Sequence, residues 1–451
     1  MKKTDDQIDF NFSRPLDIQK NLDINFLDIV LTEINFEKKN PIFVKHLKFL
    51  ILELFYCWLE SSHQMLSVSM SKRGYLSDSR YNPNKISSYT IKVVKFLQKE
   101  KLIEFYPGFF DSIRKKSRLS RIRATTNLME LFKRVSLPKK FKISHPSREY
   151  LIKTDGKKKV EYLDDFETQD VKEVMFNYNE LISKTILDIP IVEDSFIKRH
   201  DNKKIIISKT NSQANYIFQE NPNKKFKIEG CWWNRIDIDF LGTFSKYFII
   251  NDEPTVFFNL NEKFNDFIKK KIGIENFFKR KDLESFDTSQ ICYLTIKGVN
   301  SKSFDSFFRS VLTEKKKFFG NEKLPSSQIK KRLETFIKNN HPISNYFFKN
   351  YRLSWEDFLT EIFYKLLKKC VPSNIPVFLI KDKVYSPLSF SEIVGSNLEQ
   401  ILELSLGGKK NGVGYVECAS YNFKSRGFFS RMFKSDKSIS KRYVERIKNY
   451  R

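Results

Sequence analysis

The stretch SYTIKVVKFLQKEKLIEFYPGFFDSIRKKSRLSRIRAT, residues 88–125, changes its hydrophobic pattern twice. Its first part places Ile91, Val94 and Leu97 on one face of a helix, and LIEFY at 102–106 then has the composition of a strand. A PGFF turn, a cationic segment and the strand-like RIRAT follow. The stretch therefore predicts a helix that leads into two strands joined by a basic loop.

Helices are predicted on both sides of this stretch. Upstream, VKHLKFLILELFYCWLES at 44–61 has apolar residues at helical spacing, and a polar link rich in Gly, Ser and Asn joins it to residue 88. Downstream, TNLMELFKRV at 126–135 has a helical pattern. The order helix, helix, strand, basic loop, strand, helix is typical of a winged helix-turn-helix, which we place at residues 41–138.

The basic loop predicts contacts with a phosphate backbone. A hairpin wing dense in cations can lie against phosphates while the helix before it presents Ser87 and its neighbours to base edges in the major groove. The alternative is a solvated basic hairpin that binds nothing. The expected DNA-binding residues are Ser88, Tyr89, Lys92, Lys95, Arg114, Lys115, Lys116, Arg118, Arg121 and Arg123.

The charge of the whole chain agrees with a polyanionic partner. The 451 residues include 81 Lys and Arg but only 54 Asp and Glu, which gives a formal net charge of +27. The bias toward Lys, Asn, Ile and Phe also fits a low-GC genome, so the clustering of cations is more informative than their total. We expect double-stranded DNA as the partner, with RNA as the alternative.

Cysteine and histidine give no sign of a metal centre. The five cysteines show no CxxC spacing and have no histidine at ligand spacing, and the five histidines are scattered. We expect neither a zinc site nor a disulfide framework, and no metal or other cofactor. Mg²⁺ would be needed only by an enzyme that uses paired carboxylates.

Nothing near the N-terminus predicts a membrane protein. MKKTDDQIDFNFSRP becomes acidic within five residues, unlike a secretory signal, and the most apolar window, 49–60, contains Glu53 and is too short to cross a bilayer. We therefore expect a cytoplasmic protein without a membrane partner.

The remainder of the chain predicts a larger α+β domain. Strand-like segments such as TVFFNL and PVFLI alternate with long helical patterns such as WEDFLTEIFYKLLKK. The expected division is an N-terminal arm at 1–40, the winged-helix domain at 41–138, a polar linking region at 139–225, the α+β domain at 226–404 and a basic C-terminal tail at 405–451.

Several motifs of the second half carry a resemblance. EGCWWNRI at 229–236, INDEPTVFFNLNEKF at 250–264, RLSWEDFLTEIFYKLL at 352–367 and IPVFLIKDKVYSP at 375–387 resemble a group of uncharacterised bacterial proteins, often of mobile elements. In that group a winged helix precedes a "GGWWQ" signature and a C-terminal half similar to the palm of family A DNA polymerases. The resemblance covers most of residues 45–404 and implies a palm-like fold.

The resemblance also implies that the chemistry of the palm is lost. Asp382 matches the aspartate of an "HDS" step, but Lys381 and Lys383 flank it. The first-motif aspartate falls on Asn259, and the lysine of the nucleotide-binding helix falls near Cys292. One carboxylate and one neutral amide cannot hold two divalent cations as two carboxylates do. Asp382 is therefore expected to be a turn residue of a β-hairpin, and catalytic residues are not assigned.

A competing carboxylate pair lies in RIDIDFL. Asp237 and Asp239 alternate along a predicted strand, so their side chains share a face and could hold a metal together. A polar outer face of an edge strand explains the pair equally simply, and we favour that interpretation.

The basic hairpin and the charge predict a DNA-binding protein. The resemblance implies an inactive polymerase-like domain and a role in replication or maintenance of a plasmid or other mobile element. Two alternatives stay open. One is an active polymerase or nuclease that uses Asp382 with another carboxylate. The other is a transcription regulator whose C-terminal half senses a partner.

Overall fold

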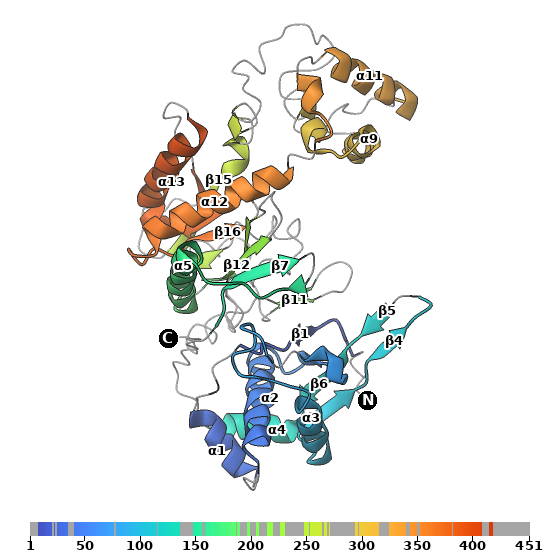
Figure 1. Cartoon of the computed structure of the whole chain (residues 1–451), viewed down its shortest axis with the longest axis vertical. Coiled ribbons are helices and arrows are strands. Elements are labelled where there is room, and N and C mark those ends of the chain that lie inside the picture. The colour runs from blue at the N-terminus through green and yellow to red at the C-terminus, as the bar shows by residue number, and fades with distance from the viewer. Residues whose placement is uncertain are drawn as a thin grey trace, which may run out of the picture.

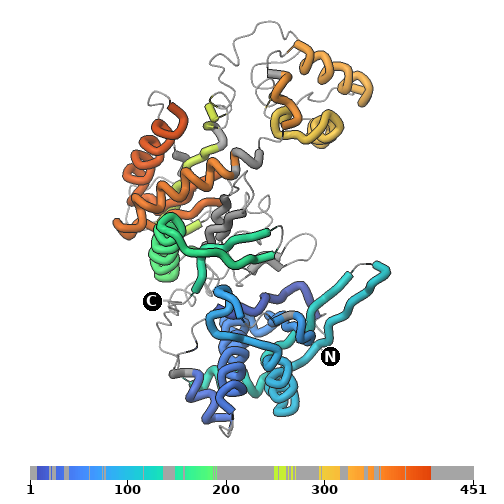
Figure 2. The backbone as a smooth tube through the Cα atoms, in the orientation of Figure 1, coloured from blue at the N-terminus to red at the C-terminus, as the bar shows by residue number. Residues whose placement is uncertain are grey.

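The protein folds into two units of mixed α+β structure with several small sheets (Figures 1 and 2). Residues 8–135 form the first unit and residues 148–417 the second. The computed structural model describes residues 8–19, 22, 25–34, 40–75, 78–114, 116–135, 148–155, 158–185, 187–189, 196–198, 204–206, 214–219, 226–230, 248–251, 253–263, 266–267, 270, 294–295, 297–314, 324–339, 343–349, 352–380, 382–407 and 415–417.

The first unit surrounds one long helix. Its elements are β1 (Ser13–Pro15), α1 (Asn25–Glu33), α2 (Pro41–Glu60), β2 (Met65–Val68), η1 (Lys72–Gly74), α3 (Thr90–Lys99), β3 (Ile103–Tyr106), β4 (Phe109–Asp111), β5 (Lys116–Arg118), β6 (Ser120–Ala124) and α4 (Thr126–Arg134). The helices expected at 44–61 and 126–135 are α2 and α4. The sheet has the order β1-β2-β6-β3, in which β1 and β2 are parallel and the other pairs antiparallel.

Helix α2 begins sharply because its first turn is capped. The Asn40 side chain accepts hydrogen bonds from the backbone N–H groups of Ile42 and Phe43, and Pro41 occupies the first helical position. From Leu47 to Cys57 almost every residue is buried, as expected of a helix covered on all sides. Around it, α1, α3, α4 and the sheet complete the first core.

Two parts of the first unit differ from the expected pattern. The polar link between the first two helices contains β2, and the N-terminal arm supplies the edge strand β1 and the helix α1. In α3 the buried residues are Thr90, Val93, Val94 and Leu97, whereas Ile91 is half-buried. The arm is therefore part of the first core rather than an appendage.

A buried ion pair joins the arm to α2. Arg14 on β1 and Glu53 on α2 lie 3.9 Å apart, Nη2 to Oε2, with side chains that are 2% and 0% exposed. The same carboxylate oxygen accepts the backbone N–H of Asp17 at 3.2 Å. The guanidinium group lies 5.7 Å from the centre of the Tyr56 ring. The arm is thus held by charges that are withdrawn from water.

The second unit combines sheets with long helices. Its elements are β7 (Leu151–Asp155), β8 (Lys158–Lys159), α5 (Phe166–Ser183), β9 (Leu187–Asp188), β10 (Phe196–Lys198), β11 (Lys204–Ile206), β12 (Ala214–Gln219), β13 (Phe226–Gly230), β14 (Ile249–Ile250), β15 (Glu253–Asn259), η4 (Leu260–Lys263), α9 (Phe304–Thr313), α11 (Ser326–Asn339), η5 (Ile343–Tyr346), α12 (Arg352–Cys370), β16 (Phe378–Ile380), β17 (Lys383–Pro387), η6 (Leu388–Phe390), α13 (Ser391–Leu406) and β18 (Tyr415–Glu417).

Two sheets organise this unit. One has the order β16-β17-β15-β14-β9, with β18 also paired to β15, and the other has the order β13-β12-β7-β8. Figure 1 shows α5, α12 and α13 beside these strands, while α9 and α11 pack against each other at the far end of the molecule. Helix α13 approaches β15 closely, since a Cβ on Gly395 would lie 3.2 Å from the Phe258 ring.

The expected linking region contributes to the second core. Tyr178 on α5 is buried and donates its hydroxyl hydrogen to the Val377 carbonyl at 2.7 Å. Asp170, also on α5, accepts hydrogen bonds from Tyr364 at 2.6 Å and Lys368 at 3.0 Å, both on α12. These contacts make α5 an integral layer of the unit.

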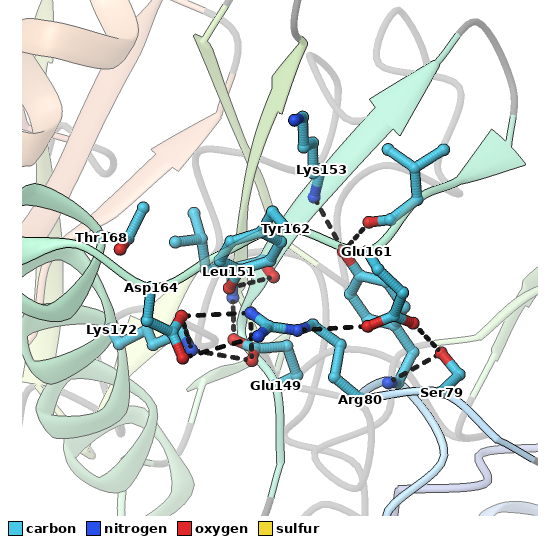
Figure 3. A network of polar contacts seen from close by, with 12 residues as sticks. Ser79, Arg80, Glu149, Leu151, Lys153, Glu161, Tyr162, Asp164, Thr168 and Lys172 are labelled. Atoms are coloured by element: carbon cyan, nitrogen blue, oxygen red, sulfur yellow. Dashed lines mark hydrogen bonds and ion pairs between the residues drawn. The ribbon is translucent and has the colours of Figure 1, made fainter.

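Arg80 joins the two units (Figure 3). It lies in the segment before α3, and its guanidinium reaches carboxylates of the second unit: Glu149 at 3.6 Å, Glu161 at 3.4 Å and Asp164 at 3.1 Å. The group also stacks over the Tyr162 ring, with Cζ 3.7 Å from its centre.

Neighbouring contacts extend this junction. Tyr81 donates its hydroxyl hydrogen to the Val160 carbonyl at 2.9 Å and accepts the backbone N–H of Lys153 at 3.0 Å. On the side of the arm, the two carboxylate oxygens of Asp17 accept hydrogen bonds from the Arg148 Nη1, at 2.9 and 2.8 Å. The first unit is therefore joined to the second unit through its N-terminal arm and through the segment that leads into α3.

Candidate functional site

Helix α3 has an apolar inner face and a cationic outer face. Opposite its buried residues, Lys92, Lys95 and Lys99 are exposed at the spacing of neighbours on one helix face. Lys92 and Lys95 were expected at this site, whereas Lys99 was not identified from the sequence, although the helical repeat from Lys95 points to it. The helix offers a row of three ammonium groups to solvent.

The N-terminus of α3 is fixed by His46 of α2. The His46 Nδ1 lies 2.7 Å from the Ile42 carbonyl oxygen, and Nε2 accepts the backbone N–H of Ser87 at 2.9 Å. Nδ1 therefore carries the hydrogen and donates a hydrogen bond to the Ile42 carbonyl oxygen. Burial lowers the pKa of His46 and keeps the ring neutral. Ser87 is thus engaged with the protein rather than presented to a ligand.

Ser88 and Tyr89 lie in the turn that precedes α3, and both are half-buried. The Tyr89 hydroxyl accepts a hydrogen bond from the Asn40 side chain at 3.3 Å. The Lys92 ammonium lies 4.4 Å from the centre of the Tyr89 ring. The tyrosine therefore supports the first cation of the row.

The strands β4 and β5 form a separate two-stranded hairpin that continues from β3 and β6. In Figure 1 it projects from the first unit, away from the helices. At its base, a Cβ on Gly108 would lie 2.3 Å from the Arg118 carbonyl oxygen, so this close approach requires glycine. At its tip, the Asp111 side chain accepts the backbone N–H groups of Ile113 and Arg114, each at 3.0 Å. Both ends of the hairpin are thus held in shape.

The cations expected on the wing fall into two groups. Arg114 and Lys116 are exposed, and the Arg114 Nε lies 3.9 Å from the Asp111 Oδ2 in a long ion pair. Both lie near the tip and point their charge toward solvent. Lys115, between them, lies outside the described residues.

The other cations of this hairpin and of β6 bond within the protein. Arg118 donates to the Pro107 carbonyl at 3.0 Å and stacks 3.7 Å from the centre of the Phe10 ring. Arg121 donates to the Phe10 carbonyl at 3.2 Å, and Arg123 pairs with Glu104. Burial, and then the charge of Arg118, lower the pKa of Arg121. These three arginines support the base of the hairpin.

In the second unit, strand pairing brings together the two positions singled out for metal chemistry. Asn259 at the end of β15 pairs in register with Lys383 on β17, and the Leu260 N–H donates to the Asp382 carbonyl oxygen at 2.8 Å. Asp382 lies in the turn between β16 and β17. Residues 259 and 382 thus meet at one edge of the sheet.

The remaining candidates for chemistry lie elsewhere. Asp237, Asp239, Cys292 and Lys381 are outside the described residues, as is the basic tail beyond Glu417. Within the described part of the chain, no three His, Cys, Asp or Glu side chains gather where they could hold a metal ion. Cys370 is buried against α13, and burial raises the pKa of its thiol to about 11.

Comparison of the chain with protein-family models, with curated proteins and with solved structures found no match. None of the helices in the described ranges has the length and apolar character required to cross a bilayer.

Proposed function

We propose that the protein binds double-stranded DNA through its first unit, with α3 as a recognition helix in the major groove and β4–β5 as a wing against the phosphates. The observation that carries this proposal is the strand order β2-β6-β3, with the projecting hairpin β4–β5 placed between β3 and β6. A winged helix requires this arrangement, in which the recognition helix immediately precedes the strand that leads into the wing.

The placement of charge supports the same function. Lys92, Lys95 and Lys99 line the outer face of α3, and Arg114 and Lys116 occupy the far part of the hairpin. One feature departs from a helix-turn-helix: between β2 and α3 the described residues include only the short η1, where a full helix would precede the recognition helix. The Arg80 junction occupies that segment instead.

Removing exposed wing cations should weaken the salt dependence of binding. For Arg114→Ala combined with Lys116→Ala, the slope of log K against log salt should fall in magnitude by about 1.8, since each phosphate contact contributes about 0.9. Fluorescence anisotropy with a labelled duplex at several salt concentrations measures the slope. A competing RNA duplex of the same sequence tests the alternative ligand.

The matched control removes the same charge from another surface of the unit. Lys133 and Arg134 on α4 are exposed and paired with Glu130 and Glu33. Their double alanine variant should leave the slope nearly unchanged. An equal loss of slope in both variants would mean that net charge alone attracts DNA, and the wing would lose its assigned role.

We further propose that the second unit is a polymerase-palm-like scaffold without catalysis, in a replication or maintenance system of a mobile element. The proposal is supported by the pairing that brings Asn259 beside the Asp382 turn, together with the neutral side chain at position 259. Two-metal chemistry needs anionic ligands from both strands, and here one strand supplies an amide.

The catalytic part of this proposal predicts the absence of primer extension. Neither the wild type nor Asp382→Ala should extend a primed template with Mg²⁺ or Mn²⁺, and both should bind the same duplex with similar Kd values. Extension by the wild type that Asp382→Ala abolishes would instead establish an active polymerase.

A further inference from the structure

The tip of the wing exposes apolar side chains. Ile113 is 92% exposed and Phe110 is 78% exposed, and Phe109 and Leu119 on the same hairpin are about half exposed, at 50% and 53%. These four account for a third of the twelve exposed large hydrophobic residues in the described part of the chain. Apolar side chains gathered on one projecting element indicate a binding surface.

No described element of the protein covers this tip. The hairpin is a sheet of two strands by itself, paired through Phe109 with Arg118, Phe110 with Ser117 and Asp111 with Lys116. It joins neither hydrophobic core. The apolar side chains therefore contribute to neither core, which directs attention to a ligand.

The surrounding charge selects the class of ligand. Ile113 is followed directly by Arg114, and Lys116 opens the returning strand, so an apolar side chain and exposed cations lie within four residues of chain. A nucleic-acid duplex offers both complements: phosphates for the cations, and base faces between which an apolar side chain can insert. The formal net charge of +27 also attracts the protein to a polyanion such as a nucleic acid.

The dimensions favour entry at a deformed site. Paired strands lie about 4.8 Å apart, whereas the minor groove of B-DNA is about 6 Å wide, so a hairpin with side chains enters only where the groove opens. Proteins that insert apolar wedges open the groove by unstacking one base step and kinking the duplex. Asp111 holds the turn at Ile113 in shape for such a contact.

Resting on the proposed DNA binding, we propose that the tip of the wing is a base-step wedge. Ile113 and Phe110 insert at one step of the minor groove, while Arg114 and Lys116 hold the flanking phosphates. The preferred substrate is therefore duplex DNA that unstacks easily, such as DNA with a mismatch, rather than a rigid, fully paired duplex.

The test compares the full-length protein on two 30-base-pair duplexes, one fully paired and one with a single central mismatch. The wild type should bind the mismatched duplex about tenfold more tightly, because the mismatch has already lost part of its stacking energy. It should also raise the fluorescence of 2-aminopurine placed beside the mismatch. Phe110→Ala combined with Ile113→Ala should reduce the preference to about one and leave the salt slope unchanged, because phosphate contacts set that slope.

A control variant removes equally exposed apolar groups elsewhere. Leu163 and Phe166 are 92% and 89% exposed in the second unit, so Leu163→Ala with Phe166→Ala should retain the tenfold preference. Equal binding of both duplexes by the wild type would overturn the wedge while leaving the DNA-binding proposal intact. Absence of any duplex binding would overturn both.

Anionic lipid vesicles provide the last comparison, since cations beside an apolar tip also suit a lipid surface. Vesicles of one part phosphatidylserine to three parts phosphatidylcholine should bind the wild type and the Phe110→Ala, Ile113→Ala variant equally, since only the net positive charge attracts the protein to them. Binding that the Phe110→Ala, Ile113→Ala variant loses, without a preference for the mismatch, would assign the tip to membranes and overturn the wedge.

Discussion

Replacement of Glu53 by Ala is expected to lower the free energy of unfolding of the first unit by about 3–5 kcal/mol, the range found when one partner of a buried ion pair is removed. The variant would leave the Arg14 guanidinium buried, 2% exposed, without its carboxylate. It would also remove the acceptor of the Asp17 N–H. Both effects act on the arm, so β1 should separate from β2 before α2 unfolds.

Hydrogen–deuterium exchange of the full-length protein shows which segments lose stability in this variant. Peptides from residues 10–19 and 47–57 should exchange much faster in Glu53→Ala, while peptides from α12 should not change. The matched variant Arg14→Met with Glu53→Leu replaces both charges by apolar groups of similar length and should recover most of the stability. If the double variant is as unstable as Glu53→Ala, the ion pair itself rather than the lone charge stabilises the arm.

Replacement of Arg80 by Ala is expected to lower the free energy of opening the junction between the units by about 2 kcal/mol. Hydrogen bonds to charged groups contribute about 1.5–3 kcal/mol, and partial exposure of the Arg80 side chain, at 21%, weakens its ion pairs. The carboxylates of Glu149, Glu161 and Asp164 would then lie close together without the guanidinium, and Lys172 would still pair with Glu149 and Asp164. Their repulsion adds to the loss of the guanidinium stacked on Tyr162.

Exchange in peptides from residues 78–84 and 148–164 should rise by about 30-fold in this variant, the equivalent of 2 kcal/mol. Arg73→Ala, which removes an exposed arginine from the same segment, is the control and should have no effect. Unchanged exchange in Arg80→Ala would mean that Asp17, Arg148 and Tyr81 suffice to hold the units together.

The same junction should depend on pH in a defined direction. The hydrogen bond from Lys172, and then that from Arg80, lower the pKa of Asp164 below its ordinary value of 3.8. A lowered carboxyl pKa stabilises the junction fully above the ordinary value, and this contribution is lost as the pH falls through the lowered pKa. Exchange across the junction should accordingly rise on acidification below about pH 4.

Much of the local structure could be predicted from the sequence. The spacing of apolar residues located α2, α3, α4 and α12, because a helix that buries one face repeats its apolar residues every three to four positions. The strands β15, β16 and β17 were located by their β-branched and aromatic composition. The short strands β1 and β2 were missed, since three or four residues carry too little pattern to distinguish a strand from a loop.

The candidate site was predictable only in part. The basic hairpin and the cations Lys92 and Lys95 follow from the order of residues along one helix and one loop. The sequence did not predict which of the hairpin's cations would be exposed. Arg118, Arg121 and Arg123 bond to Phe10, Pro107 and Glu104, and these partners are set by strand register and by the position of the arm.

Sequence by itself determined the mixed α+β class, the charge of the chain and the positions of helices such as α2 and α12, because these depend on composition and on periodicity between near neighbours. Tertiary structure alone decided which charges are exposed. Glu53, which lies in an apolar stretch of sequence, forms an ion pair with Arg14 of the arm. Arg80 forms ion pairs with three carboxylates of the second unit, and Asn259 lies beside the Asp382 turn because β15 pairs with β17. Each of these contacts joins residues tens to more than a hundred positions apart, and their pairing depends on the packing of whole elements rather than on any local pattern.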